Sequence, residues 1–159
     1  GVVIIEGLHA LNPLLTEGLL TEGLFRMFIS VSTNVTVDGK RIISGRKLRF
    51  IRRMVRDFYY RGMSADRTYQ VWQSVLAGED KYLYPYRHLA DVSLNTFHPC
   101  ETAVMKPFAL PVLETLTEKN DYTDTVRSAV EEFFTVSEEE VLDTLSESSL
   151  LREFIPREE

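Results

Sequence analysis

The sequence predicts an α/β fold in which a partial parallel sheet of three strands is followed by a helical C-terminal extension. Strand-like runs at residues 2–5, 26–31 and 90–95 are separated by segments with a helical pattern, which is typical of parallel sheets. The first run, Val2-Val3-Ile4-Ile5, is continuously apolar and β-branched, as in strands that are buried on both faces. Because such a strand rarely opens a domain, we expect the chain to be the C-terminal part of a larger protein.

Length and composition favour an ordinary globular protein. The chain has 159 residues, 44% of them hydrophobic and 26% charged, which excludes wholesale disorder and collagen-like order. Its one cysteine, Cys100, excludes a scaffold of internal disulfides. No apolar run approaches the roughly 18 residues that a membrane span needs. We therefore expect a cytoplasmic protein without a signal peptide or a membrane partner.

Charge divides the chain into two parts. Residues 1–100 hold 13 Lys and Arg against 9 Asp and Glu, whereas residues 101–159 hold 5 against 15. We predict a domain over 1–100 and a helical acidic extension over 101–159. Residues 40–67 contain ten of the eighteen basic residues and only two acids, so an anionic ligand is expected there. The acidic remainder opposes nucleic acid as a partner.

The elements of residues 1–60 follow from local pattern. After the first strand, residues 13–24 are expected to form a helix or a broken helical turn, followed by the strand at 26–31. Residues 32–44 are expected to be a loop with a turn at Asp38-Gly39. Apolar residues of 46–60 recur with helical spacing, which predicts an amphipathic helix.

Turn and cap residues predict where the elements after residue 60 begin and end. Arg61-Gly62 is expected to end that helix, and Ser64 to cap a second one that runs to about Ala77. Residues 78–80 are expected to break the second helix before an aromatic connector at 82–86. After the strand at 90–95, helices are expected at 101–119, 122–134 and 137–146, followed by a tail.

Two features suggest phosphate chemistry. Arg49, Arg52, Arg53 and Arg56 are spaced to share one helical face, and their mutual repulsion is relieved if an anion binds over them. Alternatively, they form a solvated face or pair with the acidic C-terminal helices. Glu6 follows the first strand, where a carboxylate binds Mg²⁺ at a nucleotide, caps a helix or lies on the surface.

The order of several motifs resembles the uridine kinase and phosphoribulokinase family of P-loop kinases, most closely its longer bacterial members. The motifs that carry the resemblance are Val3 to Leu11, Ile51 to Asp57, Tyr60-Arg61-Gly62, Tyr84-Pro85, Ala90-Asp91-Val92, Met105 to Phe108 and Ser148 to Ile155. The resemblance implies a sheet of the P-loop NTPase type with a helical lid at about 46–80. It also implies ATP- and Mg²⁺-dependent transfer of a phosphoryl group to a small acceptor, most often the 5′-hydroxyl of a uridine or cytidine.

The resemblance also implies roles for single residues. Glu6 matches the acid that helps to bind Mg²⁺ at ATP, Arg53 an arginine near the acceptor, and Arg56 and Arg61 catalytic arginines at the ATP phosphates. His9 lies just after the expected strand end, where it either binds substrate or has a structural role.

One motif of the family is absent. The phosphate-binding loop G-x-x-x-x-G-K-[ST] does not occur, because none of the eight glycines has the required spacing. We therefore expect this chain alone to be inactive, with that loop and the catalytic base in a missing N-terminal half. A phosphoribulokinase-like or pantothenate-like acceptor, a non-catalytic nucleotide-sensing or protein-interaction domain, and a homo-oligomer all stay open.

Overall fold

The computed structural model describes residues 1–156, apart from the side chains of Thr21 and Val37. The chain forms two compact units. The first unit consists of Gly1–Ser30 and Val71–Thr96, and the second of Val31–Gln70 together with the chain from Phe97 onward. The helical C-terminal part therefore shares a compact unit with the arginine-rich helix that precedes it in the sequence.

The first unit contains a parallel pair of strands. β1 (Met27–Ser30) pairs with β4 (Val92–Asn95), with Met27 opposite Val92 and Ser30 opposite Asn95. At the start of the pair, the backbone N–H of Arg26 donates to the Asp91 carboxylate at 2.7 Å. The chain between these strands includes α2 (Ala65–Tyr82) and η3 (Tyr84–Leu89), while η1 (Pro13–Leu15) and η2 (Thr21–Gly23) precede β1. Two of the three expected strands and the broken helical turn at 13–24 are thus confirmed.

The expected strand at residues 2–5 is wrong. These residues have no regular secondary structure, and the exposed fractions of Val2 and Ile5 are 92% and 60%. An apolar, β-branched run becomes a buried strand only where a neighbouring strand supplies backbone hydrogen bonds and other elements cover its faces. Within residues 1–156, no strand pairs with this run. The mixed α/β class is correct, but the described sheet that contains β1 has two strands rather than three.

α2 (Ala65–Tyr82) is longer than the sequence predicts. It begins as expected, because the Ser64 hydroxyl accepts from the N–H of Arg67 at 3.2 Å. The break expected at 78–80 is wrong, since the helix continues through Gly78. A glycine inside a helix costs only about 1 kcal/mol relative to alanine, and the burial of Trp72 and Glu79 on the same helix outweighs that local preference.

The second unit opens with a hairpin where the sequence predicts a loop. β2 (Val35–Val37) and β3 (Lys40–Ile43) are antiparallel. The expected turn between them is confirmed, and both turn residues have positive φ, 49° at Asp38 and 77° at Gly39. Asp-Gly is a preferred pair for such hairpin turns. The short, irregular strands lack the alternation that would have predicted them.

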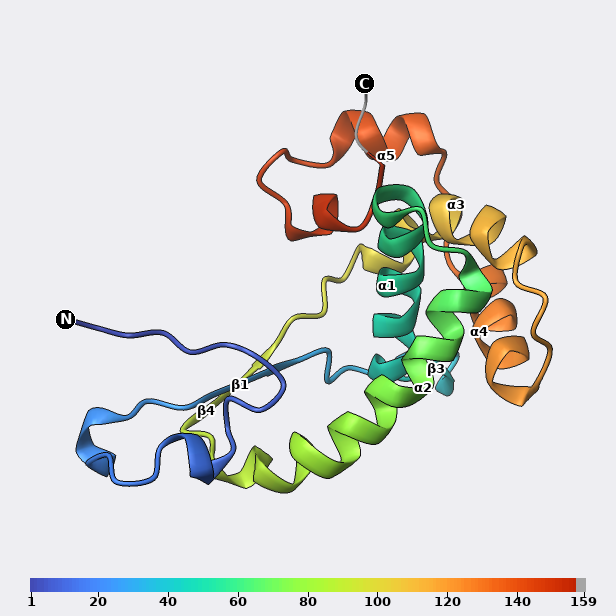
Figure 1. Ribbon diagram of the computed structural model, residues 1–159. Coiled ribbons are helices and arrows are strands. Elements are labelled where there is room, and N and C mark those ends of the chain that lie inside the picture. The colour runs from blue at the N-terminus through green and yellow to red at the C-terminus, as the bar shows by residue number, and fades with distance from the viewer. Residues whose placement is uncertain (157–159) are drawn as a thin grey trace. The chain divides into compact units, whose positions relative to one another are not determined.

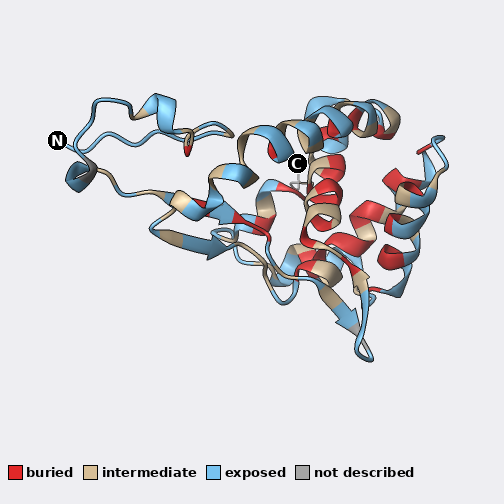
Figure 2. Ribbon diagram, turned by 90° about the horizontal axis from the view of Figure 1, so that it is seen from below, coloured by how far each residue is buried: buried red, intermediate tan, exposed pale blue. Residues whose placement is uncertain are grey.

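The helices of the second unit bury most of the core. α1 (Gly45–Arg61) packs against α3 (Glu101–Glu114), which also packs against α4 (Asp121–Glu132) and α5 (Glu138–Thr144) (Figure 1). η4 (Leu150–Glu153) follows. Figure 2 shows buried residues gathered on these helices, whereas the N-terminal stretch is largely exposed. All four expected helices of this unit are confirmed, although α3 ends at Glu114, before the predicted residue 119.

The core of the second unit is apolar and includes residues that are far apart in the sequence. Its fully buried side chains come from α1, α3, α4 and η4 and include Leu48, Ile51, Met54, Met105, Leu113, Val130 and Leu151.

Among residues 1–156, no helix has the combination of length and hydropathy that crossing a membrane requires.

Candidate functional site

The C-terminal half of α1 carries Arg53, Arg56 and Arg61, three of the arginines that the sequence singled out. Gly62 ends the helix in the left-handed conformation with φ 60°, and its N–H donates to the Asp57 carbonyl. The N–H of Met63 donates to the same carbonyl at 3.0 Å. These bonds are typical of a glycine-terminated helix. Residues four apart on a helix are neighbours, so Arg53, Asp57 and Arg61 lie in one row.

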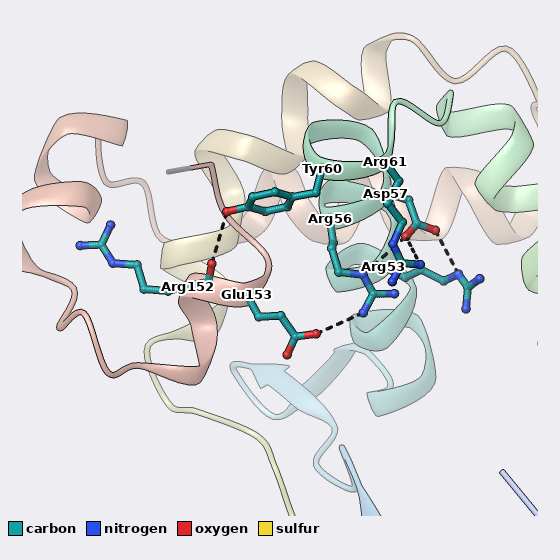
Figure 3. Close-up of polar contacts among 7 residues, drawn as sticks. All are labelled: Arg53, Arg56, Asp57, Tyr60, Arg61, Arg152 and Glu153. Atoms are coloured by element: carbon teal, nitrogen blue, oxygen red, sulfur yellow. Dashed lines mark hydrogen bonds and ion pairs between the residues drawn. The ribbon is translucent and has the colours of Figure 1, made fainter. Parts of the chain in front are cut away.

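Three guanidinium groups surround the Asp57 carboxylate, which is fully buried (Figure 3). Asp57 Oδ2 lies 3.2 Å from Arg53 Nε, and Asp57 Oδ1 lies 3.1 Å from Arg61 Nη1 and 3.5 Å from Arg56 Nε. We call these four residues the arginine cluster. Within the described residues the Asp57 oxygens make ion pairs but no hydrogen bonds, so the carboxylate is compensated mainly by charge.

A second carboxylate reaches the cluster from the C-terminal part of the chain. Glu153 Oε1 lies 3.3 Å from Arg56 Nη1, and Arg56 lies between Asp57 and Glu153 (Figure 3). Three guanidinium charges against two carboxylates leave a formal charge of +1. Guanidinium groups present planar, bidentate donors that match phosphate or carboxylate oxygens. The cluster can therefore accept one more anion, or exchange Glu153 for one.

Arg52 does not belong to the cluster, although its spacing predicted a shared face with Arg53 and Arg56. It is buried and makes a bidentate ion pair with the buried Glu101 of α3. Its guanidinium also lies 5.2 Å from the centre of the Phe154 ring. The expectation of four arginines on one anion-binding face is thus wrong for Arg52. The alternative of pairing with the acidic C-terminal part is correct for this residue.

Two other basic residues of segment 40–67, Lys47 and Arg67, have structural contacts. The Lys47 ammonium lies 5.0 Å from the centre of the Tyr122 ring, and burial, together with the positive charge of Arg41, lowers the pKa of Lys47. Arg67 donates to Gln70 on the same helix at 3.4 Å. Lys47 and Arg67 therefore make contacts outside the arginine cluster.

Glu6 and His9 belong to the first unit, whereas Arg53, Arg56 and Arg61 belong to the second. Within the second unit, the structure brings the guanidinium groups of the three arginines together around Asp57. The premise for Glu6 was wrong, since residues 2–5 form no strand for it to follow. Glu6 is exposed, and the ring centre of His9 lies 4.8 Å from that of Tyr82 in a T-shaped contact.

Metal ligands are sparse in the described part of the chain. Residues 1–156 contain no group of three or more His, Cys, Asp or Glu side chains that could together hold a metal ion. Magnesium at nucleotide sites commonly uses one or two carboxylates together with phosphate oxygens and water. An exposed carboxylate such as Glu6 has the right chemistry for that limited contribution.

Asp57 and Glu153 were not predicted as members of the site. Asp57 could have been found, because it stands four residues after Arg53 and four before Arg61, the spacing of helical ion pairs. Glu153 could not, because it is 97 residues from Arg56 in the chain and only tertiary packing brings them together.

Comparisons with protein-family models, with curated proteins and with solved structures found no match for this chain. Support for a function therefore comes from this chain's own residues, chiefly the arginine cluster, and from the resemblance of its motifs.

Proposed function

We propose that this chain is part of an ATP- and Mg²⁺-dependent kinase that transfers the γ-phosphoryl group to a small-molecule hydroxyl. The proposed family is that of uridine kinases and phosphoribulokinases, with a P-loop type of sheet, a lid at about 46–80, and a nucleoside of the uridine or cytidine type as acceptor. The observation that supports it is the convergence of Arg53, Arg56 and Arg61 on one buried carboxylate. The proposed protein acts in the cytoplasm and supplies the glycine-rich phosphate loop from elsewhere in its chain.

Phosphoryl transfer depends mainly on positioning and on stabilising charge. Negative charge spreads over the oxygens of the transferring group, and arginines that are held in place stabilise it. In this proposal Arg56 and Arg61 contact the phosphates, and Arg53 lies toward the acceptor. The ion pairs with Asp57 hold the three guanidinium groups in place before the ligand arrives, which lowers the cost of ordering them.

The residues of the first unit have simpler proposed roles. Glu6 contributes one oxygen ligand to Mg²⁺, and the metal neutralises charge on the ATP phosphates when it is bound. His9 contributes a polar group to the acceptor site. α1 and α2 exclude water from the reaction as a lid.

The decisive experiment measures ATP-dependent phosphorylation by the longer protein that contains this chain. The acceptor panel holds uridine, cytidine, other nucleosides, ribulose 5-phosphate and pantothenate. The variants are Arg61→Gln and, as a matched control, Arg67→Gln, since both remove one exposed guanidinium. We expect Arg61→Gln to lower kcat by about 10³-fold, the scale of a transition-state arginine, and Arg67→Gln to leave it nearly unchanged.

Either of two results would contradict the proposal. If Arg61→Gln and Arg67→Gln were equally active, the arginine cluster would have no role in catalysis. ATP binding without any phosphorylated product, from a folded protein, would instead favour a nucleotide-sensing role. Product from ribulose 5-phosphate or pantothenate alone would keep the kinase but change its acceptor.

A further inference from the structure

The C-terminal segment Leu150–Ile155, which we call the strap, is anchored on the second unit. Leu151 and Ile155 are fully buried. The hydroxyl of Tyr60, on α1, donates to the carbonyl of Ile155. Burial of such apolar side chains stabilises the position of the segment. The strap is therefore held beside the last turn of α1, where the arginine cluster lies.

The two neighbours of Glu153 in the strap are held separately. The Arg152 guanidinium donates to the carbonyls of Leu142 at 2.6 Å and of Leu145, which are at the C-terminal end of α5. On the other side, the Phe154 ring packs on the guanidinium of Arg52. Because both neighbours are held in place, the fold determines the position of the Glu153 backbone. The Glu153 carboxylate therefore lies beside Arg56.

The two carboxylates of the site differ in how readily they can leave. The Asp57 side chain is wholly buried, whereas 54% of the Glu153 side chain is exposed and 21% of that of Arg56. An exposed ion pair stabilises only weakly, and its carboxylate regains water when it moves away. A buried carboxylate has no such alternative. Glu153 is thus the displaceable partner, and Asp57 is the permanent one.

We propose that Glu153 is an internal competitor of the anionic ligand: the strap holds its carboxylate on Arg56, and a phosphate-bearing ligand must displace it. The identity of the ligand as a phosphate compound rests on the proposed function. The apparent affinity is then reduced by the fraction of molecules in which Glu153 occupies Arg56. Any event that draws the strap away raises the affinity of the cluster for phosphate without altering an arginine.

The test uses the whole chain and inorganic tripolyphosphate as the probe. Dissociation constants are measured by isothermal titration calorimetry at low ionic strength, where charge effects are largest. The proteins are the parent sequence, Glu153→Gln, Glu147→Gln and Arg56→Gln. Glu147 is also exposed in the C-terminal region but has no contact with the cluster among the described residues. Its variant therefore matches the change in net charge.

We expect Glu153→Gln to bind tripolyphosphate about threefold more tightly than Glu147→Gln, the scale of an exposed ion pair. Arg56→Gln should bind more weakly than the parent. If the two glutamate variants bind equally while Arg56→Gln is weakened, the internal competitor is refuted and the phosphate site of the proposed function stands. If no variant binds the probe, both are refuted. If Glu153→Gln binds tripolyphosphate threefold more tightly but the longer protein has no kinase activity, the internal competitor is supported and the proposed function is refuted.

Discussion

At the scale of single residues, Asp57 determines how the arginine cluster is built. Its carboxylate is fully buried, and the structure compensates it with Arg53, Arg56 and Arg61 at 3.1–3.5 Å. Three like charges in one place repel one another, so the cluster depends on the negative charge at its centre. A residue that the sequence shows as one acid within a basic segment is thus the centre of the site.

The first prediction concerns that charge. Asp57→Asn keeps the size of the side chain but leaves three guanidinium groups without their central carboxylate. We expect it to lower the free energy of unfolding by about 3 kcal/mol, as when one partner of a buried ion pair is removed. Chemical denaturation measures the change. Asp143→Asn, which neutralises an exposed aspartate of α5, is the control and should stay within about 0.5 kcal/mol.

A second prediction follows from Asp66. Its Oδ1 accepts the N–H groups of Thr117 at 2.9 Å and Glu118 at 3.1 Å, and its Oδ2 accepts the Thr117 hydroxyl at 3.0 Å. Burial raises the pKa of Asp66, but these hydrogen bonds to the charged form outweigh it and hold the pKa below its usual value.

Because the folded-state pKa of Asp66 is lowered, its stabilisation is complete above the unfolded-state pKa of about 3.9 and is lost as the pH falls through the folded-state value. We expect Asp66→Asn to melt at a lower temperature than the parent at pH 7, with a difference that shrinks below about pH 4. Melting curves from pH 2.5 to 7 measure it. A difference that is independent of pH would show that the charge of Asp66 does not contribute.

At the scale of elements, α1 depends on the close approach of its first residue to the irregular segment that follows β1. A Cβ on Gly45 would lie 2.0 Å from the Val31 carbonyl oxygen and 3.2 Å from that of Thr33. Both contacts are backbone atoms and cannot rotate away. Only glycine allows the helix to begin at this place, which in turn positions the arginines two to four turns later.

We therefore expect Gly45→Ala to destabilise the chain by about 3 kcal/mol, at the upper end of overpacking in a core. Gly23→Ala is the matched control, because a Cβ there would meet no atom within 4 Å. Its effect on the free energy of unfolding should be close to zero. Thermal or urea denaturation of the two variants distinguishes them, and equal stability would contradict the close approach at Gly45.

At the scale of the whole molecule, the two units differ in their cores. Of the buried apolar residues that the structure describes, only Leu11, Phe28 and Trp72 belong to the first unit. The second unit buries side chains of α1, α3, α4 and α5, of the start of α2 and of the strap. A two-stranded sheet with little apolar cover is marginally stable on its own, so the units should differ in local stability.

Hydrogen exchange followed by mass spectrometry tests that difference. We expect the amides of α1 and α3 to exchange slowest, because they open only when the main core unfolds. The amides of β1 and β4 should exchange faster, and those of residues 2–25 fastest of all. Protection of β1 equal to that of α1 would contradict the unequal division of the core.

Local patterns predicted most of the helices. The apolar spacing of residues 46–60, the cap at Ser64 and the glycine at position 62 determined α1 and the start of α2, because helix formation and termination depend on neighbours within a few residues. The same is true of the turn at Asp38-Gly39. The strands β1 and β4 and their parallel direction were also predicted, since two strand-like runs are separated by helical sequence.

Tertiary structure decided the rest, because the partners are far apart in the chain. Whether residues 2–5 form a strand depends on a neighbouring strand, which no local pattern specifies. Whether Arg52 is buried or exposed depends on Glu101, and whether Arg56 faces solvent or a carboxylate depends on Glu153. The sequence by itself determined that residues 46–60 are basic and helical. Only the packing of the C-terminal part decided which arginines remain able to meet a ligand.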